Sequence, residues 1–97
     1  MEIKRSADID ALFAAILSLK SIDECYRFFE DALTAREVLD ISQRIKAAKM
    51  LKAGKSYLDV SLETGMSTAT ISRVSKALER GAGGYKMILA RLEDNAE

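Results

Sequence analysis

Hydroxyl and basic side chains recur between Gly65 and Leu78, and such groups are typical of nucleic-acid binding. Hydroxyls hydrogen-bond to phosphates or bases, and an arginine can donate a bidentate pair to guanine. Short side chains at the start of a helix let that helix enter a major groove deeply. The residues of this kind are Ser67, Thr68, Ala69, Thr70, Ser72, Arg73 and Lys76. They predict a helix whose outer face contacts DNA.

Other chemistries have few residues to support them. The chain has no His and one Cys, whereas a zinc site needs several such ligands at set spacings. A Cys–His nucleophile pair is excluded for the same reason, and Cys25 is expected to fill a helical core. Asp59 and Glu63 lie one turn apart but beside a basic face, which favours surface charges over a catalytic pair. We therefore expect no enzyme and no metal.

The charges of the chain are segregated although they sum to zero. Residues 1–43 carry five Lys or Arg against nine Asp or Glu, whereas residues 44–80 carry eight against three. The basic block supplies the local excess that phosphate binding requires. It includes a row of residues before the predicted recognition helix, of which Lys49, Lys52, Lys55 and Ser56 are expected at DNA phosphates. Lys46 is interpreted as a solubilising surface charge.

A helix-turn-helix is the element that would position these groups. Two short crossing helices need a small residue within the first and a turn residue that tolerates positive φ; Ser61 and Gly65 stand at those places. Ser67 can cap the second helix. Apolar residues that would lock the two helices together are Val60, Met66, Ile71 and Val74.

The remaining chain is predicted to be helical throughout, in one domain of residues 1–97. Asp8 is expected to cap a helix to about Leu19, "SIDE" (21–24) and Thr34 with Glu37 are capping boxes, and Ser56 starts a helix to about Thr64. Gly54 suits a C-cap, and a last helix of about residues 85–92 precedes a polar tail. Residues 1–33 are rich in apolar side chains. They predict a dimer core, with a large intramolecular core as the alternative.

Location is constrained by the absence of any apolar run long enough for a bilayer or of a signal-peptide segment. A single Cys suits a reducing compartment. We expect a cytoplasmic protein that does not enter a membrane.

The segment from Leu33 to Leu78 resembles the core of the bacterial tryptophan repressor, and within that superfamily the YerC/YecD-type group. The matching features are "LT" opening a helix, an Arg eleven residues after Leu33, "LKAG" closing the helix, and "ATISR". The resemblance implies an all-α, six-helix chain that forms an intertwined homodimer. It also implies helix-turn-helix heads, formed here by residues 34–80, that bind palindromic operators, with residues 81–97 as a C-terminal helix and tail.

The resemblance further implies a co-effector pocket at Thr34, Arg44, Arg73 and Val74. In the repressor the residue after the recognition-helix arginine is Gly, which lets the indole of tryptophan pass close to the backbone; here it is Val74. A serine that the repressor has one turn further on is replaced here by Ala77. The loop before the motif is one residue shorter than in the repressor. These departures argue against L-tryptophan and leave the co-effector unidentified.

The sequence therefore predicts a dimeric transcription regulator, a repressor, that binds double-stranded DNA specifically. The alternative is a protein-interaction module that has the shape of a helix-turn-helix without binding DNA. That alternative favours an apolar exposed face, whereas the predicted face is polar and basic.

Overall fold

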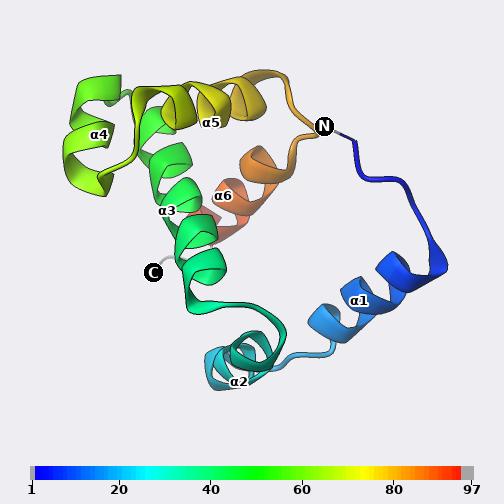
Figure 1. Cartoon of the computed structure of the whole chain (residues 1–97). Coiled ribbons are helices and arrows are strands. Elements are labelled where there is room, and N and C mark those ends of the chain that lie inside the picture. The colour runs from blue at the N-terminus through cyan, green and yellow to red at the C-terminus, as the bar shows by residue number, and fades with distance from the viewer. Residues whose placement is uncertain (1, 95–97) are drawn as a thin grey trace. The chain divides into compact units, whose positions relative to one another are not determined.

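The computed structural model describes residues 2–94, and every regular element in that range is an α-helix (Figure 1). The prediction of an all-α chain of six helices is confirmed. The expected polar tail falls partly on residues 95–97, which lie outside the described range. The helices are α1 (Ala7–Leu17), α2 (Ile22–Ala32), α3 (Ala35–Lys52), α4 (Tyr57–Thr64), α5 (Thr68–Arg80) and α6 (Gly84–Asp94).

Side-chain caps explain where the first two helices begin. The Ser6 hydroxyl accepts a hydrogen bond from the Ile9 N–H at 3.1 Å, so α1 starts at Ala7. The helix ends at Leu17. The expectation that Asp8 caps this helix is wrong. Asp8 lies in the first turn, where its negative charge interacts favourably with the positive end of the helix dipole. In α2 the predicted Ser21 cap is confirmed, since the Ser21 hydroxyl accepts from Glu24 N. The Glu24 carboxylate reaches back to the Lys20 N–H, one residue before the Ser21 amide that a capping box would use.

The long helix α3 has a defined start and end. Thr34 and Glu37 form the predicted capping box, since the Thr34 N–H donates to Glu37 Oε1 at 2.9 Å and the Glu37 N–H donates to Thr34 Oγ1 at 3.1 Å. At the other end Gly54 has φ +89°, and the Lys55 N–H donates to the Met50 carbonyl. Glycine adopts this left-handed conformation without steric cost, so the chain turns here toward α4.

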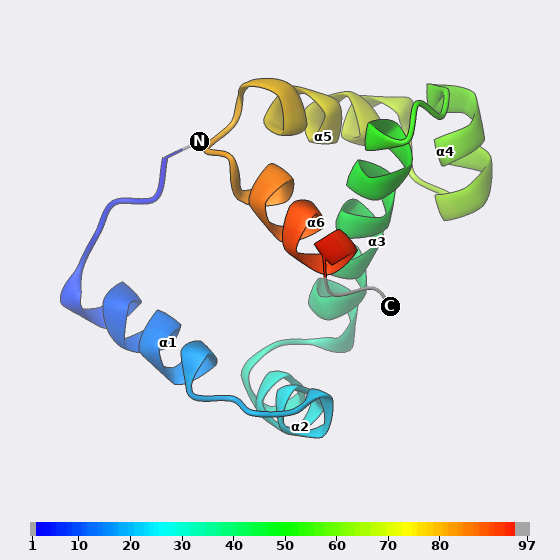
Figure 2. The same ribbon diagram turned by 180° about the vertical axis from the view of Figure 1, so that it is seen from behind.

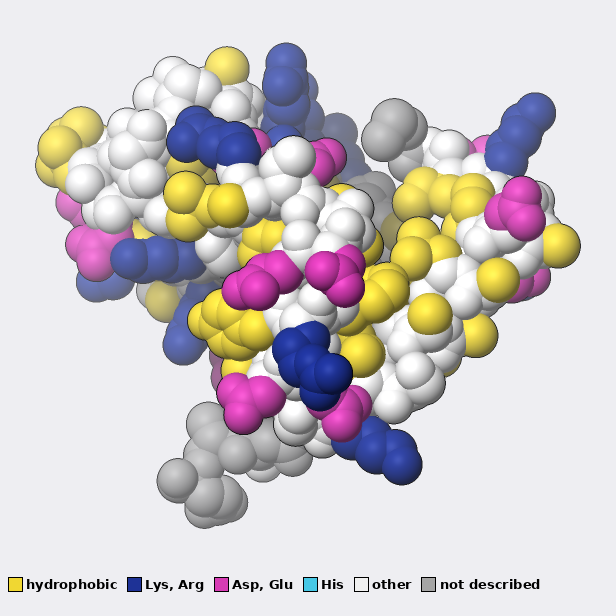
Figure 3. Space-filling view, turned by 60° about the horizontal axis from the view of Figure 1, so that its bottom comes forward, with side chains coloured by type: hydrophobic (Ala, Val, Ile, Leu, Met, Phe, Trp, Pro, Cys, Tyr) yellow, Lys and Arg dark blue, Asp and Glu magenta, His cyan; other side chains and the backbone are white. Residues whose placement is uncertain are grey.

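The chain divides into two compact units, Met1–Val38 and Leu39–Glu97. In the first unit no residue of α1 or α2 is buried, and large apolar side chains lie at the surface (Figure 3). Leu17 is 84% exposed and Ile22 is 75% exposed. Phe28 and Phe29 stack edge to face at 5.2 Å, and Cys25 is only partly buried. The alternative to the predicted dimer core, a large intramolecular core, is therefore not formed by these two helices.

The second unit contains the buried core, which α3, α4, α5 and α6 all supply. Helix α5 packs against α4 and against α6, and Figure 2 shows α6 running beneath it. The core side chains are Ala47, Ala48, Val60, Ile71, Val74 and Leu89, all of them at most 3% exposed. The two α3 alanines are fully buried, and Ile71 of α5 and Val60 of α4 are the largest fully buried side chains of this core.

Candidate nucleic-acid interface

The turn between α4 and α5 has the geometry that the motif predicted. Gly65 ends α4 with φ +75°, and its N–H donates to the Ser61 carbonyl at 2.8 Å. The Ser61 hydroxyl donates to the Met66 carbonyl at 2.9 Å, which ties the middle of α4 to the turn. A small hydroxyl side chain thus lets the helices pack together and also satisfies a backbone acceptor of the turn.

A hydroxyl pair organises the first turn of α5. Ser67 accepts the Thr70 N–H at 3.2 Å, and the two hydroxyls lie 3.0 Å apart. The cap removes one of the free amides that a helix start leaves, so α5 begins sharply at Thr68. Ser67 and Thr70 were both predicted at DNA, and each has a structural partner within its own chain.

The two faces of α5 differ as a recognition helix requires. Ile71 is fully buried and Val74 is 3% exposed, whereas Arg73 and Lys76 are exposed. Thr68 and Ala69 are exposed at the start of the helix, and Ser72 is partly buried. The short residues therefore lie on the first turn and the cations on the following turns.

The predicted basic row divides into paired and unpaired lysines. Lys52 Nζ lies 3.3 Å from Glu93 Oε1 of α6, and Lys46 Nζ lies 3.7 Å from Glu63 Oε1 of α4. Lys49 and Lys55 are exposed and have no carboxylate within 4.0 Å among residues 2–94, and the same holds for Arg44, Arg73 and Lys76. The unpaired cations are the groups that a phosphate could neutralise without first displacing a carboxylate of residues 2–94.

Ser56 and Thr34 act as helix caps. The Ser56 hydroxyl accepts the Asp59 N–H at 3.1 Å and starts α4. The Thr34 hydroxyl donates to Glu37 Oε1 at 3.0 Å in addition to accepting from Glu37 N. The hydrogen bonds from the Thr34 backbone and then from its side chain hold the pKa of Glu37 below its ordinary value. A co-effector that used the Thr34 hydroxyl would compete with this cap.

The end of α5 carries features that the sequence patterns missed. The Gly81 N–H donates to the Ala77 carbonyl at 2.9 Å, and a Cβ on Gly81 would overlap that carbonyl oxygen. Lys86 Nζ lies 3.5 Å from the Glu79 carbonyl. Since Gly81 has an ordinary negative φ, its requirement is steric and no turn-type rule would have identified it. Glu93 was missed because pairing between α3 and α6 depends on tertiary structure.

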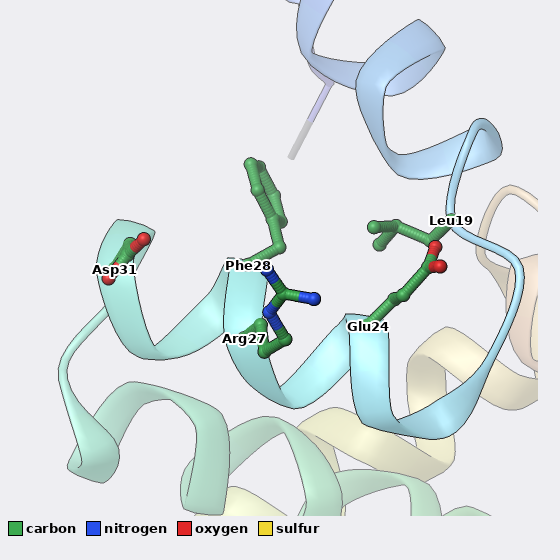
Figure 4. Close-up of a pocket in the computed structure, with 5 residues that line it drawn as sticks. All are labelled: Leu19, Glu24, Arg27, Phe28 and Asp31. Atoms are coloured by element: carbon green, nitrogen blue, oxygen red, sulfur yellow. The ribbon is translucent and has the colours of Figure 1, made fainter.

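A shallow pocket in the first unit is lined by Leu19, Glu24, Arg27, Phe28 and Asp31 (Figure 4). Glu24 is occupied by its helix cap, and the other two charged residues have opposite signs. No group of three or more potential metal ligands occurs among residues 2–94. No described helix is long and apolar enough to cross a membrane.

Nearly the whole chain matches one known protein family. The family model described as "Trp repressor protein" matches residues 7–93. The chain belongs to the Trp repressor family. That match extends the resemblance seen at Leu33–Leu78 over nearly the whole chain, into both the apolar N-terminal helices and α6.

Similar proteins and solved structures agree with this assignment. The uncharacterised protein YerC of Bacillus subtilis is 47% identical over 90 residues, which cover 93% of this chain and 86% of YerC. A TrpR-like protein from Eubacterium eligens superposes with a TM-score of 0.89 at 49% identity, with 92% of each chain covered. A putative Trp repressor from Staphylococcus aureus gives 0.88 at 48% identity, covering 92% of this chain and 89% of that one. The chain is thus a Trp-repressor-like protein of the YerC type.

Proposed function

We propose that this member of the Trp repressor family is a dimeric, sequence-specific transcription regulator that binds a palindromic operator through α5. The observation that carries the proposal is the outer face of α5. The side chains of its first turn are short and Ser67 caps that turn, while the exposed Arg73 and Lys76 have no carboxylate partner among residues 2–94. Such a face can enter a major groove and offer donors to base edges and phosphates.

The surrounding cations give this face a phosphate-binding border. Lys49 and Lys55 are exposed near the end of α3 and in the loop that follows it, and neither has an ion pair in the described chain. Contacts of this kind strengthen binding to any sequence and make it salt-dependent, whereas base contacts provide specificity. Arg73 is the residue we assign to base recognition.

The proposed dimer uses the helices that have no core of their own. Phe13 and Leu12 on α1 are each 46% exposed, and Tyr26 on α2 is 67% exposed. Clusters of exposed large apolar side chains mark interaction surfaces, so a second copy would bury them. In helix-turn-helix dimers, the Trp repressor among them, the two recognition helices enter successive major grooves about 34 Å apart. The operator is therefore proposed to be palindromic, the dimer to act as a repressor, and its location to be the cytoplasm.

Selection of bound sequences from random double-stranded DNA tests the proposal directly. We expect enrichment of a palindrome. Selections run with and without a small-molecule extract show whether an unidentified co-effector contributes. Fluorescence anisotropy on the enriched site then compares Arg73→Ala with Lys20→Ala, an exposed lysine in the loop before α2. Arg73→Ala should weaken binding by about 5- to 150-fold and relax the preference at one base pair. Enrichment of no sequence, together with no salt-sensitive binding, would refute the proposal.

The second candidate, a protein-interaction module, is supported by one observation on α4. Leu58 and Leu62 lie one turn apart and are 67% and 77% exposed. Photo-crosslinking from position 62 would test it: a defined protein partner combined with no DNA binding would favour this candidate over a DNA-binding regulator.

A further inference from the structure

The side chain of Val74 lies in the buried core to which α3, α4, α5 and α6 all contribute. It is 3% exposed and belongs to the cluster that contains Ala47 and Ala48 of α3, both fully buried. Arg44 lies on α3 one turn before these alanines, and Arg73 directly precedes Val74 on α5. The residues one turn after Arg44 and directly after Arg73 therefore belong to one packed cluster.

An aromatic co-effector does not fit this arrangement. The membership in the Trp repressor family implies tryptophan, whose indole would have to approach the α5 backbone where the Val74 side chain now stands. Interiors are close-packed, so a ring can enter only if Val74 leaves the cluster and exposes its methyl groups. Both arginines are exposed and remain available for other anions, including phosphates.

Helix α5 is fixed by its own chain at its start, middle and end. Ser67 caps the first turn, while Ile71 and Val74 contact the core supplied by α3, α4 and α6. At the last turn Gly81 donates to Ala77, and the absence of a Cβ allows that close approach. The core contacts of its middle residues place this helix against α4 and α6.

We infer that Val74 takes the place of an aromatic co-effector between α3 and α5, so that the recognition helix is held for DNA binding without L-tryptophan. This inference rests on the proposed function and specifies its regulation. A small molecule that does control the protein would bind somewhere other than beside Val74. The residue acts by positioning α5 and does not itself contact DNA.

The first experiment uses the whole protein, freed of small molecules by refolding, with millimolar L-tryptophan as the probe. We expect the midpoint of thermal unfolding and the affinity for the selected operator to be unchanged by the amino acid. A ligand that couples to DNA binding typically changes affinity by about 5- to 150-fold, and one that binds only the folded state raises the midpoint. Either change would overturn the inference.

The second experiment separates positioning from general stability. Val74→Ala is compared with Leu89→Ala, because both side chains are 3% exposed in the same cluster and only Val74 belongs to α5. Leu89→Ala removes more carbon atoms and should lower the unfolding midpoint further. Val74→Ala should nevertheless weaken operator binding more, measured at a temperature where both variants are folded. Losses of affinity that simply follow the losses of stability would contradict a positioning role.

Failure of the inference can be told from failure of the proposed function. If no variant binds DNA under any condition, the proposed function is refuted, and with it the statement that α5 is held for DNA binding. The thermal measurement still decides the other part: a midpoint raised by L-tryptophan contradicts the inference, and an unchanged midpoint supports closure of the space by Val74.

Discussion

Gly81→Ala should destabilise the protein more than its position in a surface loop suggests. Gly81 follows the last residue of α5 and has φ −78°, a value that alanine adopts without strain. The conflict is with the preceding turn: a Cβ would overlap the Ala77 carbonyl oxygen and lie 3.1 Å from both the carbonyl carbon and Cα of Ala77. Since all three are backbone atoms, no side-chain rotation can relieve the contact.

The magnitude follows from what must move. The overlap pushes Gly81 away from Ala77 and stretches the 2.9 Å hydrogen bond between them. Loss of that hydrogen bond costs about 1 kcal/mol and the strain of overpacking about 1–3 kcal/mol, so the free energy of unfolding should fall by about 2–4 kcal/mol. For a domain of this size each kcal/mol corresponds to roughly 4–8 °C in the unfolding midpoint, so a drop of at least about 8 °C is expected.

Gly84→Ala is the matched control. Gly84 is the first residue of α6, and a Cβ there would meet no atom within 4 Å. Alanine in place of a helical glycine stabilises by up to about 1 kcal/mol. Thermal unfolding followed by circular dichroism, at one protein concentration because the midpoint of a dimer depends on it, should order the proteins as Gly84→Ala, wild type, Gly81→Ala. A Gly81→Ala midpoint no lower than that of Gly84→Ala would refute the steric reasoning.

Three further results are expected. Glu37→Gln should reduce the acid sensitivity of the protein. The lowered pKa of Glu37 gives stability that is present above the ordinary glutamate pKa of about 4.3 and is lost as the pH falls through the lowered value. Unfolding midpoints measured from neutral to strongly acidic pH should therefore fall less steeply in the variant. An equally steep fall would show that the cap does not titrate. Glu93→Gln releases Lys52 and should tighten DNA binding by no more than about fivefold, since exposed ion pairs contribute about 0–1 kcal/mol. In anisotropy titrations, the control Asp94→Asn makes the same change in charge and should have a smaller effect. Equal effects of the two variants would mean that only net charge matters. Ser61→Ala leaves the Met66 carbonyl without its donor and should cost about 1 kcal/mol in urea unfolding, whereas unchanged stability would assign Ser61 a role of size alone.

Local signals were sufficient for most of the helix boundaries. The helix caps at Ser21 and Thr34 and the glycines at 54 and 65 were predictable because each depends on residues within one turn of the chain. The first helix shows the limit of such signals: Ser6 and Asp8 are both good cap residues two positions apart, and the competition was resolved in favour of the serine hydroxyl. The outward position of Arg73 and Lys76 also followed from helical periodicity.

The state of the basic row was not predictable. Lys49 and Lys52 are equivalent in the sequence pattern, three residues apart on one helix, yet only Lys52 pairs with Glu93. The partner is 41 residues away in the chain and approaches α3 only because α6 folds back beneath α5. The role of Val74 depended on tertiary structure for the same reason: periodicity showed that it faces inward, but not what it meets.

The sequence by itself determined the helices, most of their caps, the helix-turn-helix and the polar face of its second helix, because these depend on contacts between residues near each other in the chain. Tertiary structure decided which lysines are paired, what Val74 touches, and that α1 and α2 bury no residue. These properties arise from packing between distant segments, and a one-dimensional pattern shows which face of a helix is apolar but not which surface covers it.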